Sequence, residues 1–115
     1  MTDDLSNVQE MSSLLMEGKL EEAAEIFPKI EDSSMKEIAA VSLQGQFLMR
    51  GEIAKGESLL EYILNEDIRQ ISYQSLATQF MLVKKDCTKA KKYIDLLSDQ
   101  KTQQLVQTSY EMICE

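Results

Sequence analysis

The sequence predicts an all-helical fold, a solenoid of three helix-turn-helix repeats followed by a C-terminal capping helix. Of its 115 residues, 43% are apolar, one is proline and four are glycine, which is too apolar for a disordered chain and too poor in turn residues for a many-stranded sheet. The second observation is an internal repeat. Three apolar triplets recur at a constant spacing along the chain: Leu14-Leu15-Met16, Phe47-Leu48-Met49 and Phe80-Met81-Leu82. The length of the chain predicts one domain over residues 1–115.

Each repeat is expected to begin with a long helix that carries one of these triplets. These first helices are predicted at residues 3–17, 34–50 and 67–83. Gly18 and Gly51 follow the first two helices and are expected to take a positive φ that ends them. In the third turn Lys85 takes that place, and an extra residue near it lengthens the third repeat.

A second helix is expected in each repeat at residues 19–31, 53–65 and 87–98, so that the repeats span 3–31, 34–65 and 67–98. Apolar or small residues at offsets of 3, 4 and 3 form one stripe on each of these helices. The stripes are Leu20, Ala23, Phe27 and Ile30; Ile53, Gly56, Leu60 and Ile63; and Cys87, Ala90, Ile94 and Leu97. The small residues among them predict a close approach of the second helix to the first.

A seventh helix is predicted at residues 100–114, where it would cap the open end of the stack. Its apolar stripe is formed by Thr102, Leu105, Val106, Ser109, Tyr110 and Ile113.

Composition argues against several classes of function. The chain has no histidine, so we expect that the protein is not an enzyme and binds no metal or other cofactor. It carries 12 basic against 20 acidic residues, a net charge of −8, so we expect no nucleic-acid partner. Residues 1–66 have a net charge of −9 and residues 67–115 of +1. That acidic half would suit a basic partner, but it also fits ordinary solvated helix faces. The five lysines of residues 84–92 are likewise interpreted as a solvated face.

The two cysteines predict a reducing compartment, because Cys87 and Cys114 lack the CxxC spacing and are too few for a disulfide scaffold. Cys87 lies on an apolar stripe and is interpreted as a small core residue. No apolar run has the length of a signal peptide or a membrane span. The sequence therefore predicts a soluble, cytoplasmic protein without membrane insertion.

The turn and second helix of the first repeat resemble the tetratricopeptide repeat, in the pattern Gly18-x-x-x-x-Ala23-x-x-x-Phe27-x-x-Ile30. Leu14 and Phe47 match its first-helix aromatic position, whereas its tryptophan and its closing proline are missing. The resemblance implies a right-handed solenoid whose first helices line a concave groove. The implied groove residues are Leu5, Val8, Ser12, Leu15 and Met16; Ile38, Val41, Gly45, Leu48 and Met49; and Ile71, Gln74, Thr78, Met81 and Leu82.

Eleven of these fifteen positions are large and apolar, which favours an amphipathic helix as the ligand over a polar tail. Unbranched methionines adapt to an irregular surface, and the small row of Ser12, Gly45 and Thr78 leaves room for a backbone. Glutamate at Leu48 or Met49 is expected to abolish partner binding while helicity persists. A second interpretation stays open, in which the concave face closes around the C-terminal helix.

The length, the three repeats and the apolar groove together are similar to the YscG type of needle-protein chaperone from bacterial type III secretion systems. Four segments carry the resemblance: residues 18–23, residues 50–54, Leu97-Ser98-Asp99 and Gln104-Leu105-Val106. It implies a bacterial cytoplasmic protein that clasps the C-terminal amphipathic helix of the needle subunit and blocks polymerisation. A small helical-hairpin co-chaperone is implied as a second partner, bound to the N-terminal repeat. The alternatives are an adaptor or chaperone for another secreted client and a helical homodimerisation domain.

Overall fold

The computed structural model describes residues 3–115, and all regular secondary structure within this range is helical. The chain divides into two compact units, and the division falls between Leu64 and Asn65. We call them unit 1 and unit 2. The all-helical class predicted from the sequence is confirmed, whereas the single domain stays a prediction.

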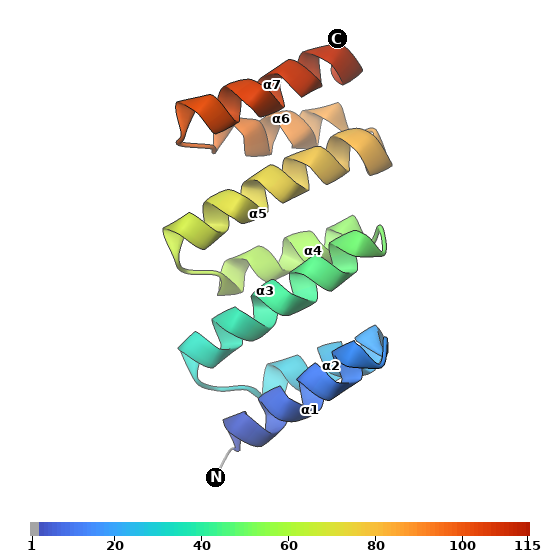
Figure 1. Cartoon of the computed structure of the whole chain (residues 1–115), viewed down its shortest axis with the longest axis vertical. Helices are drawn as coiled ribbons and strands as arrows, with labels where there is room; N and C mark the ends of the chain where they lie inside the picture. The colour runs from blue at the N-terminus through green and yellow to red at the C-terminus, as the bar shows by residue number, and fades with distance from the viewer. Residues whose placement is uncertain (1–2) are drawn as a thin grey trace. The chain divides into compact units, whose positions relative to one another are not determined.

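Unit 1 contains two helix pairs (Figure 1). Its elements are α1 (Asp4–Met16), α2 (Leu20–Ile26), a 3-10 turn η1 (Phe27–Lys29), α3 (Ser33–Met49), α4 (Ile53–Ser58) and a second 3-10 turn η2 (Leu59–Tyr62). Helix α1 packs on α2, α3 packs on α4, and α3 also contacts α1 and α2. Both second helices are shorter than predicted, because each tightens into a 3-10 turn and the chain then becomes extended at Ile30 or Ile63.

Unit 2 contains the third helix pair and the last helix. Its elements are α5 (Glu66–Gln79), a π-helical turn η3 (Phe80–Lys84), α6 (Cys87–Asp95) and α7 (Gln100–Cys114). Helix α6 packs against α5 and η3, and α7 contacts α5, η3 and α6. The π turn explains the greater length of the third repeat, because its wider turn absorbs an inserted residue without ending the helix.

The predicted turn chemistry is confirmed at all three places. Gly18 and Gly51 have φ values of 77° and 78°, and Lys85 takes the left-handed conformation with φ 56°. After the π turn, the amide of Asp86 donates to the carbonyl of Phe80 at 2.9 Å. The lysine therefore replaces glycine at the same point of the repeat.

Helices α3, α5 and α7 begin with equivalent N-caps at corresponding points of the sequence repeat. The side chains of Asp32, Asn65 and Asp99 accept hydrogen bonds from the amides of Met35, Ile68 and Thr102. The Thr102 hydroxyl and then its amide lower the pKa of Asp99, so this cap is charged at neutral pH. Helix α7 therefore starts in the way that the first helices of repeats two and three start.

A second repeating contact was not predicted from the sequence. The side chains of Asp4, Glu37 and Gln70, which recur with the period of the repeat, each accept a hydrogen bond from the backbone of a later loop. The donors are the amides of Asp32, Leu64 and Ser98, and Asp4 also accepts from Glu31. Each contact ties the end of one helix pair to the first turn of the same pair and satisfies a loop amide.

The core follows the stripes predicted for the second helices. Eleven of their twelve residues are buried, and Cys87 is the exception. Gly56 shows why a small residue is needed, since a Cβ at this position would lie 2.9 Å from Cδ2 of Leu48. Beside it, the buried Gln44 amide donates to the Gly56 carbonyl at 2.9 Å. The predicted close approach of the two helices is confirmed here.

Two glycines of unit 1 should respond in opposite directions to alanine. Gly51→Ala is expected to lower the free energy of unfolding by about 1 kcal/mol, because φ 78° is strained for a residue with a Cβ. Gly45→Ala is expected to raise it by about 0.5 to 1 kcal/mol, because Gly45 lies within α3 and its added Cβ would contact no other atom within 4 Å. Urea unfolding followed by circular dichroism measures both. Shifts in the same direction would contradict this assignment of the two glycines.

Candidate functional site

In unit 1 most of the predicted groove positions are accessible on the first helices. Met16 and Met49 are 88% and 80% exposed. Leu5, Ser12, Ile38 and Gly45 are also exposed, and Val8, Leu15 and Val41 are half-buried. Leu48 is the exception at 7% exposure. Its assignment to a groove is wrong, because its side chain fills the space that Gly56 leaves free.

In unit 2 the predicted groove positions also divide between exposed and buried residues. Ile71, Gln74 and Leu82 are exposed and Thr78 is half-buried, whereas Met81 is 1% exposed. Met81 therefore belongs to the core, although its side chain reaches the floor of the cavity described next.

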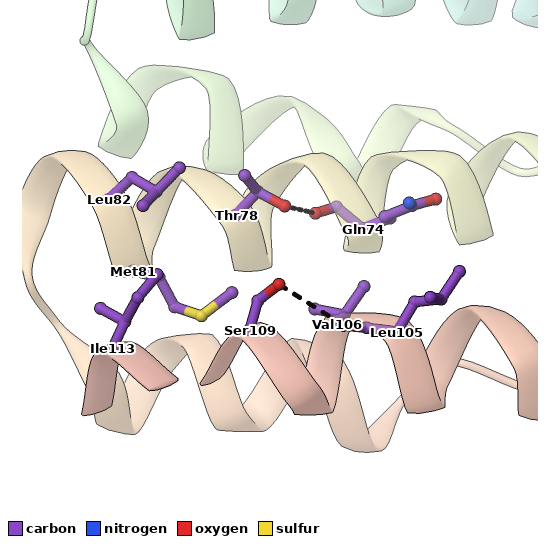
Figure 2. A pocket seen from close by; sticks show the side chains of 8 residues that line it. All are labelled: Gln74, Thr78, Met81, Leu82, Leu105, Val106, Ser109 and Ile113. Carbon is purple, nitrogen blue, oxygen red and sulfur yellow. Dashed lines mark hydrogen bonds between the residues drawn. The ribbon is translucent and has the colours of Figure 1, made fainter. Parts of the chain in front are cut away.

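A groove lies between the α5–η3 helix and α7, wholly within unit 2 (Figure 2). Its volume is about 330 Å³, and its walls come from four predicted positions on one side and four α7 residues on the other. The lining residues are Gln74, Thr78, Met81 and Leu82, with Leu105, Val106, Ser109 and Ile113. The structure thus brings four of the fifteen predicted groove residues together and adds a second wall from α7, the helix predicted to cap the stack.

The hydroxyl groups in this groove are already engaged by their own helices. The Thr78 hydroxyl donates to the Gln74 carbonyl at 3.0 Å, and the Ser109 hydroxyl donates to the Leu105 carbonyl at 3.5 Å. This back-bonding uses the hydroxyl hydrogens inside the helices. A ligand in the groove therefore meets a mainly apolar surface, with the Gln74 side chain at its edge.

Helix α7 buries only part of its predicted apolar stripe. Val106 is buried and Thr102 and Tyr110 are half-buried, but Leu105 is 71% exposed. Ser109 is exposed, and Ile113 is 42% exposed. Val106 faces the neighbouring helices, and Leu105 lies about 100° away around the helix. Leu105 instead takes the place in α7 that Ile71 takes in α5, where the side chain is also exposed.

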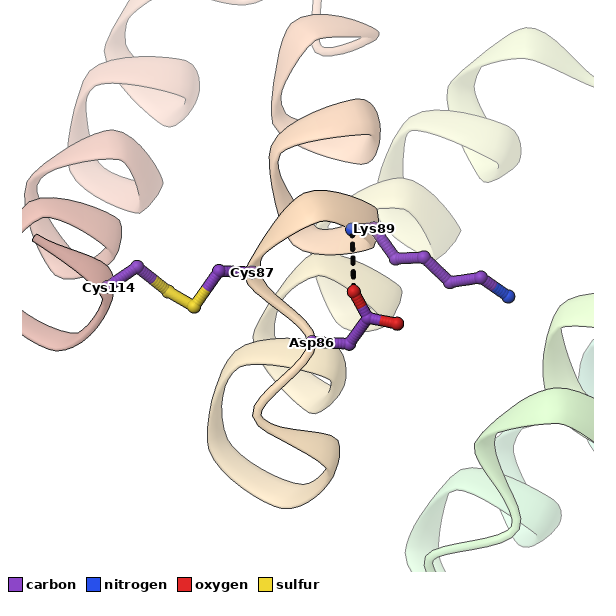
Figure 3. The surroundings of a disulfide bond; sticks show 4 residues. All are labelled: Asp86, Cys87, Lys89 and Cys114. Atoms are coloured by element: carbon purple, nitrogen blue, oxygen red, sulfur yellow. Dashed lines mark hydrogen bonds between the residues drawn. A yellow bond between two sulfur atoms is a disulfide. The ribbon is translucent and has the colours of Figure 1, made fainter.

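The two cysteines are joined in a disulfide, with Cα atoms 5.9 Å apart (Figure 3). Cys87 is the first residue of α6 and Cys114 the last of α7, and both are half-buried. The interpretation of Cys87 as a core residue is therefore wrong. Antiparallel packing of α6 and α7 places the start of one helix beside the end of the other, so the pair forms without a CxxC motif.

The net negative charge of the protein lies in unit 1. Residues 1–64 hold 5 basic and 13 acidic residues, a net charge of −8, and residues 65–115 hold 7 of each. In unit 2, Lys89 lies over the ring of Phe80 at 5.2 Å and Lys92 lies over the ring of Tyr93 at 5.3 Å. These lysines shield core rings and do not line the groove.

No family model, curated protein or solved structure matches this chain. Among the described residues, no helix has the length and apolar character needed to cross a membrane. The candidate function therefore depends on the groove and on the exposed apolar residues themselves.

Proposed function

We propose that this protein is a non-enzymatic chaperone of the YscG type, which acts in the bacterial cytoplasm during type III secretion. It holds the C-terminal amphipathic helix of the needle subunit against an apolar groove and so blocks premature polymerisation. One observation carries the proposal: apolar side chains stay exposed at equivalent positions of successive first helices. They are Leu5, Ile38 and Ile71 at one end and Met16, Met49 and Leu82 at the other.

The groove of unit 2 suits a helical ligand. It is bounded by two helices, and Leu82 and Leu105 stand 51% and 71% exposed on its opposite walls. Large exposed apolar side chains gathered on one surface are typical of binding sites. An amphipathic helix presents side chains at i, i+3, i+4 and i+7, which covers such walls and fills a cavity of about 330 Å³.

A tetratricopeptide-like solenoid is part of this proposal. The equivalent N-caps of α3, α5 and α7 and the loop contacts of Asp4, Glu37 and Gln70 support it, since both recur with the period of the repeat. Because α7 begins like a first helix and exposes Leu105, it extends the ligand-binding face of unit 2.

The small helical co-chaperone is proposed to bind alongside the needle subunit, at the N-terminal repeat. Unit 1 offers two features for such a partner, the exposed methionines Met16 and Met49 and a net charge of −8. A partner helix with an apolar stripe and basic flanks would complement both.

The groove is tested with a fluorescent amphipathic peptide, helical in solution, with leucines at i, i+3, i+4 and i+7 and polar residues elsewhere. We expect saturable binding, measured by anisotropy, that Leu82→Glu weakens at least about tenfold, because a charge then enters an apolar contact. Ser75→Glu is the matched control, since it adds the same charge to an exposed position of α5 that does not line the groove. Equal affinities for Leu82→Glu and the parent protein would reject the groove as the binding site.

Light scattering over a concentration series separates this function from self-association. The chaperone should form a soluble complex with the co-expressed needle subunit. A sharp symmetric dimer that excludes the subunit would instead favour a homodimerisation domain.

A further inference from the structure

The C-terminal half of α7 has few noncovalent ties to the rest of unit 2. Val106 is the buried residue of this helix. Gln103 donates to the Ile94 carbonyl at 3.0 Å, and Lys91 donates to the Gln107 side chain at 2.8 Å and lies 5.7 Å from the ring centre of the half-buried Tyr110. Towards the end of the helix Met112 is 80% exposed. The covalent bond from Cys114 to Cys87 is the strongest tie at this end.

The same half of α7 forms part of the groove. Ser109 and Ile113 lie on its wall opposite Thr78 and Leu82 (Figure 2). Cys114 directly follows Ile113, so the disulfide fixes the backbone beside this wall residue (Figure 3). The disulfide between the half-buried Cys87 and Cys114 therefore restrains this wall of the groove.

We propose that Cys87 and Cys114 form a redox latch on the groove. The disulfide holds the last two turns of α7 in place, and its reduction releases these turns and loosens the wall formed by Ser109 and Ile113. The inference concerns regulation of the binding site and rests on the proposed function.

The switching reaction is thiol–disulfide exchange with a dithiol reductant. One thiolate of the reductant attacks a sulfur of the pair, the other sulfur leaves as a thiolate, and the second reductant thiol resolves the mixed disulfide. Two electrons and two protons pass to the protein, giving two thiols, and the reductant becomes a disulfide. In a reducing compartment disulfides of this kind are transient and regulatory, so the reduced, loosened groove would be the resting state.

Release should stay local, because the core of unit 2 lies elsewhere. Phe80 and Tyr93 are buried on η3 and α6 and stack on each other, and neither of them lines the groove beside the final turns of α7. The bond closes a loop with a sequence separation of 27 residues, and its loss mainly frees the end of that loop.

Hydrogen exchange at the amides of residues 108–114 tests the latch. Dithiothreitol should accelerate their exchange by about tenfold or more in the parent protein. Cys114→Ser should exchange fast both with and without the reductant, and amides of α3 should not respond in either protein. Unchanged exchange at residues 108–114 on reduction would overturn the latch.

The amphipathic peptide then shows whether the latch acts on binding. We expect its affinity for the oxidised parent to exceed that for the reduced parent by at least about fivefold, with no redox effect in Cys114→Ser. Equal affinities in both redox states would overturn regulation of the groove. If exchange responds but the peptide binds neither form, the latch is supported and the proposed function is rejected.

Discussion

Replacing Leu48 with glutamate is expected to unfold unit 1. The side chain is 7% exposed and lies against the backbone of Gly56, where an added Cβ would meet its Cδ2 at 2.9 Å. Losing the buried leucine costs about 3 kcal/mol, and burying a carboxyl group without a partner costs several more. The sum, above about 5 kcal/mol, equals or exceeds the stability of many small domains.

The neighbouring variant Met49→Glu is the matched control. Met49 is 80% exposed at the end of α3, so its carboxylate would stay hydrated and the free energy of unfolding should change by less than about 0.5 kcal/mol. Thermal and urea unfolding, followed by circular dichroism, compare the two proteins. If both melt like the parent, Leu48 is not a core residue and the contact with Gly56 has been misjudged.

Leu48 and Met49 show what the periodicity of the sequence does not predict. Leu48 and Met49 belong to the same apolar triplet, yet successive residues point about 100° apart around a helix. The constant spacing of the repeat aligns the triplets but does not say which member faces the core. Gly56 indicates the answer, because a buried small residue needs a large neighbour, here Leu48, to fill the space beside it. Met81 and Leu82 divide between core and surface in the same way.

The order of the helices, the positive φ at Gly18 and Gly51 and the replacement by Lys85 were predictable, because local sequence determines them. The contacts of Asp4, Glu37 and Gln70 were missed, although their regular spacing is visible in the sequence. Polar residues also cover ordinary solvated helix faces, so their spacing alone does not reveal a contact with a loop.

The disulfide and the α7 wall depended on tertiary packing. Cys87 and Cys114 come together only when α6 and α7 are antiparallel and in register, and no local pattern encodes that register. The exposure of Leu105 likewise reflects which side of α7 meets α5 and α6. An amphipathic stripe predicts a buried face, but not how far around the helix the burial extends.

Phe80→Ala is expected to destabilise unit 2 by about 3 to 5 kcal/mol. Phe80 is 4% exposed, and its ring stacks on Tyr93 with centroids 6.0 Å apart. Tyr93 in turn stacks on Tyr73 at 5.9 Å, so the three rings join η3, α6 and α5. Alanine would leave a cavity between these elements and remove the aromatic contact.

The matched control for this variant is Phe80→Leu, which keeps most of the volume and restores the residue type found at Leu14 in the first repeat. It should cost less than about 1.5 kcal/mol. Urea unfolding measures both variants, and similar losses for alanine and leucine would mean that ring stacking, and not filled volume, stabilises this core. Because Met81 and Leu82 directly follow Phe80 and line the groove, the alanine variant should also weaken peptide binding. Leucine should preserve binding, since the groove depends on the packing beneath it.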